Sequence, residues 1–151
     1  MKADSRFVEI YRAKFTSVYR AAFVLCGDGS LAEDATQEAF AKALERWNRI
    51  GEEAWVEGWI MRTALNEVRK ARRRRVRFLA PRITEHDQHA SIELWDAVRG
   101  LPTRQQEAVV LYYLEDLDVD QVAAVMGCKN GTVKAHLWRA RQELAHLMGG
   151  S

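Results

Sequence analysis

The stretch "DVDQVAAVMGCKNGTVKAHLWRARQELAHL", residues 118–147, contains two helix signals separated by a turn. Asp118 followed three residues later by Gln121 is a capping-box pattern, which starts a short helix. Gly127 ends that helix at a position where a positive backbone φ is often needed. A second helix is predicted for residues 130–147. Two helices joined by a tight turn that contains glycine predict a helix-turn-helix.

The second of these helices is predicted to have an apolar and a basic face. Its core stripe, at helical spacing, is expected to be Val133, Leu137, Ala140, Leu144 and Leu147. The opposite face is expected to carry Thr132, His136 and Arg139, flanked by Lys134, Trp138 and Arg141. Basic groups with one aromatic ring suit the DNA major groove. The alternative is a solvated basic face on an ordinary bundle helix.

The rest of the chain also reads as helical. Only two prolines occur among 151 residues, and no alternating apolar pattern persists long enough to indicate a sheet. Further helices are predicted near residues 7–25, 31–47, 55–77, 92–99 and 103–115. Capping patterns place helix starts at Ser30 with Glu33 and at Thr103 with Gln106, and Ser91 is expected to cap the helix that follows it.

Residues 78–90, "FLAPRITEHDQHA", lose the helical period and contain Pro81. A stretch of about a dozen such residues is long for a connection inside a compact domain. We therefore expect an all-α protein with two small helical domains, residues 1–77 and 91–151, joined by a linker at residues 78–90. The second domain contains the helix-turn-helix.

Composition excludes several classes of protein. The chain has a net charge of +2, 48% hydrophobic and 29% charged residues, which indicates a folded protein. Cys26 and Cys128 are far apart and outside any CxxC pair, so neither a disulfide framework nor a redox motif is expected. No apolar run is long enough to cross a bilayer, and the first residues do not resemble a signal peptide. We expect a cytoplasmic protein with no membrane contact.

The helix near residues 31–47 is predicted to have an acidic face. Its buried stripe is expected to be Phe40, Ala43, Leu44 and Trp47. The other side carries Asp34, Gln37, Glu38, Ala41 and Glu45. Such a face is either solvated or meets a basic partner, and composition alone favours the solvated alternative.

The next helix is strongly basic. Residues 62–77 contain eight basic residues and one acid. The side expected to face the core carries Ile60, Ala64, Val68 and Ala71, and the exposed side carries Arg62, Asn66, Arg69 and Arg73. An anionic surface such as nucleic acid would relieve the mutual repulsion of these cations. Trp55 and Trp59, at the start of this helix, are expected to be core residues rather than base-stacking ones.

Three of these segments, in this order, resemble a known family. "AEDATQEAF", residues 32–40, resembles the helix with which bacterial sigma factors bind core RNA polymerase. "WIMRTALNEVRKARRRR", residues 59–75, is similar to their promoter-melting and minus-10 helix. "LPTRQQEAVVLYYLEDLDVDQVAAVMGCKNGTVKAHLWRARQEL", residues 101–144, is similar to their minus-35 reader. Two such domains and a short linker are the arrangement of the extracytoplasmic-function (ECF) class.

The resemblance implies a role for each surface. Asp34, Gln37 and Glu38 would face the clamp helices of the polymerase's largest subunit, and the polymerase flap would be a further contact. Arg62 and Asn66, with Arg69 and Arg73, would contact the minus-10 element, and the loop at residues 48–57 would hold a base flipped out of the stack. Lys134, Ala135, Trp138 and Arg139 would lie at base edges and sugars of the minus-35 element, whereas Lys129, Thr132, His136 and Arg141 would lie nearer the phosphates. An anti-sigma protein often wedges between the two domains in this class, and the expected linker permits that.

Three positions depart from the family pattern. Lys70 stands where the family usually has Asp, which predicts a basic run that is less neutralised internally. Lys129 replaces a small residue or proline at a helix N-terminus, where a cation opposes the helix dipole, so a DNA phosphate is its expected compensation. Ala135 replaces a frequent Ser and removes one hydrogen bond, which leaves the minus-35 sequence open.

Two other classes of function compete with this interpretation. A stand-alone helix-turn-helix regulator would bind DNA as a dimer, but it leaves the acidic face of residues 34–38 unexplained. For a metal protein, His86 and His89 are close enough to be ligands, but they lie in the expected linker. For an enzyme, no catalytic triad, phosphate-cradling loop or cluster of catalytic carboxylates stands out. We therefore expect no catalysis, no metal site and no cofactor.

Overall fold

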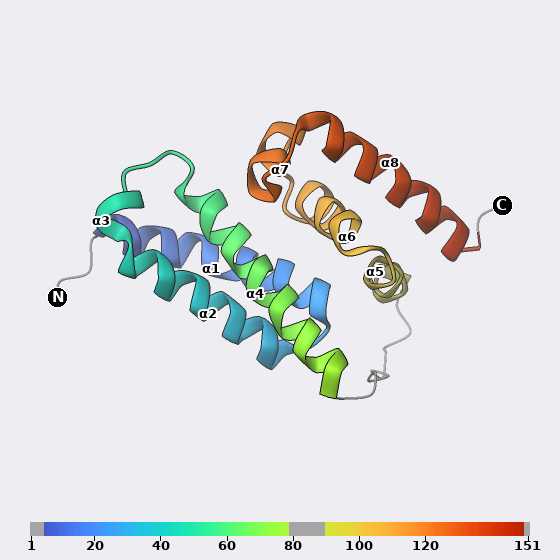
Figure 1. Ribbon diagram of the computed structural model, residues 1–151, viewed down its shortest axis with the longest axis horizontal. Coiled ribbons are helices and arrows are strands. Elements are labelled where there is room, and N and C mark those ends of the chain that lie inside the picture. The colour runs from blue at the N-terminus through green and yellow to red at the C-terminus, as the bar shows by residue number, and fades with distance from the viewer. Residues whose placement is uncertain (1–4, 79–89, 150–151) are drawn as a thin grey trace. The chain divides into compact units, whose positions relative to one another are not determined.

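The computed structural model describes residues 5–78 and 90–149, and every regular element in those ranges is a helix (Figure 1). The chain divides into two compact units after Phe78. The first unit contains α1 (Ser5–Cys26), α2 (Gly29–Glu45), the four-residue α3 (Trp47–Ile50) and α4 (Val56–Phe78). The second contains α5 (Ala90–Arg99), α6 (Thr103–Val109), the π-helix η1 (Val110–Leu114), α7 (Val119–Met126) and α8 (Asn130–Leu147). The predicted all-α fold with two small helical domains is confirmed. Most of the linker expected at residues 78–90 lies outside the described residues.

The core of the first unit lies between α1, α2 and α4. The ring of Phe40 is at its centre, with ring centroids of Phe7, Tyr11 and Phe15 from α1 at 6.3, 4.9 and 5.9 Å. Burial of one such aromatic side chain stabilises a fold by roughly 1.5–3 kcal/mol. The predicted core residues Phe40, Ala43, Trp47, Ile60, Ala64 and Val68 are buried, whereas Leu44 and Ala71 are half-buried.

The corner between α1 and α2 differs from the prediction in its capping residue. Gly27 has φ 70° and ends α1. Asp28 is then the N-cap of α2, and its side chain accepts a hydrogen bond from the backbone N–H of Leu31 at 3.1 Å. The prediction that Ser30 caps this helix was wrong. The left-handed residue Gly27 is followed directly by Asp28, and the Asp28 carboxylate already caps the helix.

The second unit is organised around α8. Among its fully buried side chains are Val98, Leu111, Val122 and Val133, from four different helices. The capping box at the start of α7 is confirmed: Asp118 accepts from the Gln121 N–H at 2.8 Å, and the Gln121 side chain accepts from the Asp118 N–H at 2.9 Å. The predicted positive φ of Gly127 is also confirmed, at 69°.

Two other predicted capping residues in this unit, Thr103 and Ser91, were wrong. Helix α6 begins at Thr103 with Pro102 as its N-cap, and the buried Gln106 side chain donates to the Arg99 carbonyl instead of completing a capping box. That helix does not continue as an α-helix to residue 115, since η1 replaces it from Val110. Helix α5 begins at Ala90, so Ser91 lies inside its first turn rather than capping it.

The apolar stripe of α8 is buried along only part of its length. Val133, Leu137 and Ala140 are buried, Leu144 is half-buried, and Leu147 is 48% exposed. The predicted stripe is therefore correct for the first three residues and wrong for Leu147, which lies beyond the packing of the unit. No helix among the described residues is long and apolar enough to span a membrane.

Candidate nucleic-acid interface

The acidic face of α2 is exposed as predicted. Asp34, Gln37 and Glu38 are all exposed, whereas Phe40 of the same helix is buried. A surface groove of about 250 Å³ opens beside them, and α4 contributes Glu67 and Arg74 to its lining. The two carboxylates of α2 thus border a concave surface of the first unit.

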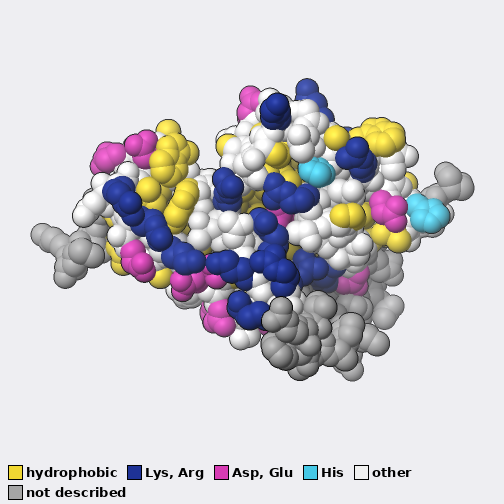
Figure 2. Space-filling view, viewed as in Figure 1, with side chains coloured by type: hydrophobic (Ala, Val, Ile, Leu, Met, Phe, Trp, Pro, Cys, Tyr) yellow, Lys and Arg dark blue, Asp and Glu magenta, His cyan; other side chains and the backbone are white. Residues whose placement is uncertain are grey.

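Helix α4 does not present its four predicted polar residues equally. Arg62 and Arg73 are exposed, whereas Asn66 and Arg69 are half-buried. The Arg69 guanidinium donates a hydrogen bond to the amide oxygen of Asn66. This contact orients the Asn66 amide, so that its NH₂ group remains available as a hydrogen-bond donor. Figure 2 shows Lys and Arg side chains gathered over α4 on the face in view.

Glu67 neutralises part of the basic run. Its carboxylate lies 2.7 Å from Lys42 Nζ of α2 and 3.2 Å from Lys70 Nζ. Burial alone would raise the pKa of Glu67, but hydrogen bonds and charge from Lys42 and Lys70 outweigh it and hold this pKa below the ordinary value. Lys70 therefore shares the Glu67 carboxylate with Lys42, and the expectation that Lys70 leaves the basic run less internally neutralised stays a prediction.

The loop between α3 and α4 exposes an aromatic side chain. Trp55 is 49% exposed, so the expectation that it belongs to the core was wrong. Trp59 is half-buried, and the Arg46 guanidinium carbon lies 5.9 Å from its ring centroid. Between the two, Val56 is fully buried and anchors the start of α4. Trp55 thus stands at the surface beside a fixed helix start, where a flat apolar ring can stack on a nucleic-acid base.

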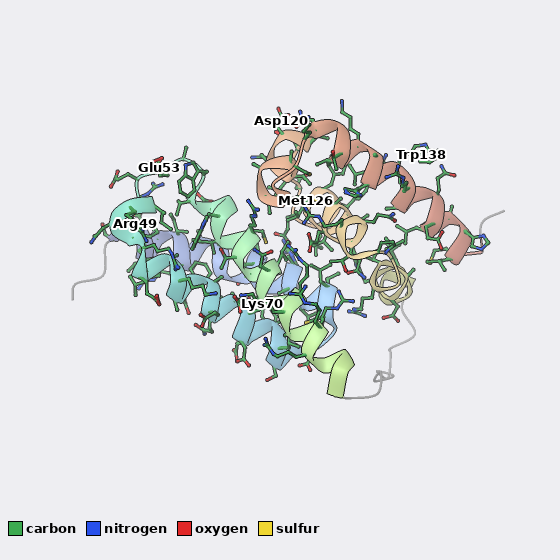
Figure 3. All side chains as sticks on the ribbon, in the orientation of Figure 1. Arg49, Glu53, Lys70, Asp120, Met126 and Trp138 are labelled. Atoms are coloured by element: carbon green, nitrogen blue, oxygen red, sulfur yellow. The ribbon has the colours of Figure 1, made fainter. Side chains whose placement is uncertain are left out.

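Most of the polar residues predicted for the outer face of α8 are exposed to solvent. Lys129, Thr132, Lys134 and Arg139 are exposed, and Ala135 is half-buried. Trp138 is 60% exposed and projects from the side of α8 that faces away from α6 (Figure 3). These side chains therefore require no rearrangement of the core to meet a partner.

His136 occupies a different environment from its neighbours on α8. It is half-buried, and its buried Nδ1 has no hydrogen-bond partner among the described residues. Burial lowers the pKa of His136, and the positive charges of Arg104 and Arg139 lower it further. In the protein by itself, this lowered pKa favours the neutral imidazole at pH 7.

Arg141 has a protein partner that sequence reasoning missed. Its Nε donates to the Tyr113 hydroxyl at 2.7 Å, and its guanidinium carbon lies 5.6 Å from the Tyr113 ring centroid. The contact joins α8 to η1 across 28 residues of sequence, and no local spacing signals it. Arg141 is thereby held against a ring that is itself exposed.

Arg104 was also missed. It donates to Glu107 Oε1 at 2.8 Å and to the carbonyl of Met126, the last residue of α7. An Arg and a Glu three residues apart on one helix are a readable pairing signal, but the contact with Met126 depends on the tertiary fold. Arg104 thus ties α6 to the turn of the helix-turn-helix.

A carboxylate of the second unit lies near the start of α8. Lys129 is its N-cap and makes no side-chain capping hydrogen bond. The Asn130 side chain donates to the carboxylate of Asp120, in the first turn of α7, which brings a negative charge to the same helix N-terminus (Figure 3). A DNA phosphate is therefore not the only possible compensation for Lys129.

The described residues contain no group of three His, Cys, Asp or Glu side chains placed to hold a metal ion. Neither Cys26 nor Cys128 forms a disulfide, and Cys26 Sγ donates to the Asp28 carbonyl at 3.4 Å. His86 and His89 lie outside the described residues.

Comparison with known proteins matches each unit to a part of one family. Residues 10–78 match the family described as Sigma-70 region 2, and residues 91–144 match Sigma-70, region 4. The ECF RNA polymerase sigma factor SigE of Mycolicibacterium smegmatis is 31% identical over 90% of this chain, which spans 59% of that protein's length. The ECF RNA polymerase sigma factor SigC of Mycobacterium tuberculosis is 30% identical over 95% of this chain and 84% of its own.

A solved structure has the same fold. The sigma factor RpoE of Bartonella quintana, in complex with the anti-sigma factor NepR, superposes with a TM-score of 0.78 at 23% sequence identity, over 95% of this chain and 96% of RpoE. The fold agrees with the sequence relationships, in which both units match in the family's order. The chain belongs to the extracytoplasmic-function class of RNA polymerase sigma factors.

Proposed function

We propose that this protein binds core RNA polymerase and directs it to promoters with minus-35 and minus-10 elements, where it assists strand opening. Residues 1–77 form the polymerase-binding and minus-10 domain, residues 78–90 a linker, and residues 91–151 the minus-35 domain. The observation that carries the proposal is the combination, in one chain of this family, of an acidic face beside a basic helix and a separate helix-turn-helix. The protein acts in the cytoplasm and has no catalytic activity of its own.

The polymerase-binding surface is the exposed side of α2. Asp34, Gln37 and Glu38 contact the clamp helices of the largest subunit. Their exposure and the adjoining groove of about 250 Å³ support this role, since basic side chains of a partner can approach the carboxylates without moving the core.

The minus-10 surface combines α4 with the loop before it. Arg62, Arg69 and Arg73 contact the DNA backbone, and Asn66 offers its amide N–H groups to a base edge. The hydrogen bond from Arg69 to Asn66 supports this division, because it orients the amide. The exposed ring of Trp55 supports the binding of an unstacked base next to α4.

The minus-35 surface is the outer face of α8. Base edges and sugars are met by Lys134, Ala135, Trp138 and Arg139, and phosphates by Lys129, Thr132, His136 and Arg141. Two observations refine this assignment. The lowered pKa of His136 favours its neutral form, and Arg141 donates a hydrogen bond to the Tyr113 hydroxyl. His136 acts as a hydrogen-bond donor, and Arg141 approaches the backbone together with an aromatic ring.

An anti-sigma protein is a further proposed partner. The sigma factor RpoE was solved with the anti-sigma factor NepR bound to it. We extend that mode of regulation to this chain, with the inhibitor covering the polymerase-binding face. A co-purification of this chain with a protein that blocks its binding to core polymerase tests the extension.

The central experiment mixes purified protein with core RNA polymerase. A complex on gel filtration and run-off transcription from a discrete promoter, recovered from a promoter library, are the expected results. Asp34→Ala with Glu38→Ala should weaken polymerase binding by about 10- to 100-fold and leave the binding of minus-35 duplex unchanged.

The matched control is Glu9→Ala with Glu143→Ala, which removes the same charge from exposed positions on α1 and α8, outside the proposed face of α2. If the wild-type protein does not bind core polymerase, the proposal is contradicted. A stable dimer that binds palindromic DNA without polymerase would instead identify a stand-alone regulator.

A further inference from the structure

The loop between α3 and α4, residues 51–55, is short and is fixed at both ends. Residues 52–55 are exposed, and Glu53 marks the loop in Figure 3. At its far end the loop enters α4 at Val56, which is fully buried and whose N–H donates to the Glu53 carbonyl at 3.2 Å. At its near end Gly51 is buried, although its neighbours in the loop are not. The exposed part is therefore a brief span between two fixed points.

Gly51 lies against an aromatic side chain. A Cβ at this position would come within 2.6 Å of the Trp47 ring, so the backbone passes closer to the indole than any other residue would allow. Trp47 is itself held from the other direction by Phe7 of α1, with ring centroids 5.2 Å apart at an interplanar angle of 83°. The first turn of α1 thus supports the loop through one intervening ring.

Arg6, the neighbour of Phe7, contacts the loop directly. Its Nε donates to the Gly51 carbonyl at 2.6 Å, across 45 residues of sequence. This carbonyl is at the C-terminal end of α3, a helix of only four residues, where the backbone oxygens lack partners within the helix. A charged donor makes a stronger hydrogen bond than a neutral one. Lys14 and Glu57 add a second link at 3.3 Å, but both are about half exposed, so that link is weak.

We infer that Arg6 is a positioning residue for the loop between α3 and α4: it holds the Gly51 backbone so that residues 52–55 form a preshaped receptor for the unstacked non-template base of the minus-10 element. The inference rests on the proposed function, and it adds the start of α1 to the parts of the molecule that act on promoter opening. A loop that is already ordered loses less conformational entropy when it binds a base than a loose one does. Arg6 itself does not contact the DNA in this arrangement.

The first test needs no promoter. Hydrogen exchange of residues 52–55 is compared in the full-length wild type, Arg6→Ala, Arg6→Lys and Arg12→Ala. Arg12 is an exposed cation further along α1, so its removal matches the change in charge. Arg6→Ala should exchange about tenfold faster in this loop, Arg6→Lys should recover part of the protection, and Arg12→Ala should match the wild type. Equal exchange in Arg6→Ala and Arg12→Ala overturns the inference.

The second test uses the complete polymerase complex and the promoter recovered by run-off transcription. Each non-template base of the minus-10 element is replaced in turn by an abasic site, and formation of heparin-resistant open complexes is measured. Arg6→Ala should form open complexes about 3- to 10-fold more slowly than Arg12→Ala on intact DNA. The difference should disappear on the template that lacks the unstacked base, as a double-mutant cycle requires.

The outcomes separate the two ideas. If the wild type does not bind core polymerase, the proposed function and this inference both fail. If the wild type opens the promoter and Arg6→Ala opens it equally well, only the inference fails. A defect of Arg6→Ala that persists on every abasic template, or an equal loss of polymerase binding, also overturns it, because the effect would not act through base capture.

Discussion

Helices α4 and α8 are both rich in cations, but the side chains of those cations make different contacts. In α4, Lys70 lies 3.2 Å from Glu67, and Arg69 is bonded to Asn66. In α8, Lys134 and Arg139 are exposed, and burial together with the charges of Arg104 and Arg139 lowers the pKa of His136. Asn66 and Lys70 of α4 are thus oriented by contacts within the helix before any partner arrives. On α8 a buried apolar stripe fixes the helix and Tyr113 holds Arg141, whereas Lys134 and Arg139 are exposed and can fit a groove.

Arg139→Ala should have the largest effect among tests of this contrast. Because Arg139 is exposed on the outer face of α8, its loss should weaken minus-35 binding by about 1–3 kcal/mol and leave polymerase binding and the unfolding of the second unit unchanged. Fluorescence anisotropy with minus-35 duplex at several salt concentrations measures this. If only the salt dependence falls and sequence preference stays, Arg139 contacts phosphate rather than a base edge.

Two glycines test how tightly each unit is built around its proposed DNA surface. Gly51→Ala should lower the free energy of unfolding by about 1–3 kcal/mol, because the new methyl group would come within 2.6 Å of the buried Trp47 ring. Gly131→Ala, in the first turn of α8, has no atom within 4 Å and should raise it by about 0.5–1 kcal/mol. Urea unfolding measures both. A similar change in the two variants would contradict the contrast.

Glu67→Gln tests the internal neutralisation of α4. The variant keeps the shape of the side chain but removes a carboxylate that holds Lys42 of α2 and Lys70, so the first unit should lose roughly 1 kcal/mol at pH 7. Because the folded pKa of Glu67 is lowered, its contribution is present above the ordinary value of 4.5 and is lost as pH falls through the lowered pKa. Unfolding followed from pH 7 to pH 3 should therefore be flatter in Glu67→Gln. An unchanged profile would show that the cluster is not energetically coupled.

A structural feature can be predicted from the sequence when the residues that cause it are close together in the chain. The capping box at Asp118 and the turn at Gly127 were predicted correctly, because both are decided by residues within one helical turn. Ser30 was wrong for an equally local reason: Asp28, two residues earlier, provides the cap after a left-handed glycine. Signals of this kind fail when two residues close together in the sequence can both cap the same helix.

The features that escaped prediction depend on side chains far apart in sequence. Arg6 with Gly51, Lys42 with Glu67, and Tyr113 with Arg141 are separated by 45, 25 and 28 residues. The helical period predicts helices that contain Lys42, Glu67, Tyr113 and Arg141. It does not indicate which of these side chains contact one another. The π-helix η1 was missed for a related reason, since its hydrogen-bond register is decided by packing rather than by a motif.

His136 gives the smallest expected effect and the sharpest contrast with Glu67. Its folded pKa is lowered by burial and by the charges of Arg104 and Arg139, so the unfolded chain binds a proton more readily than the folded one. The sign is therefore that stability of the second unit begins to fall as pH drops through the ordinary value of 6.5, whereas the Glu67 contribution persists until the pH is below 4.5. His136→Gln should remove this dependence between pH 7.5 and about 5.5. Unfolding of the second unit, followed by hydrogen exchange in α8 across that range, measures it. A slope that survives in His136→Gln would assign the titration to another group and would remove the ground for treating His136 as a neutral donor at the minus-35 surface.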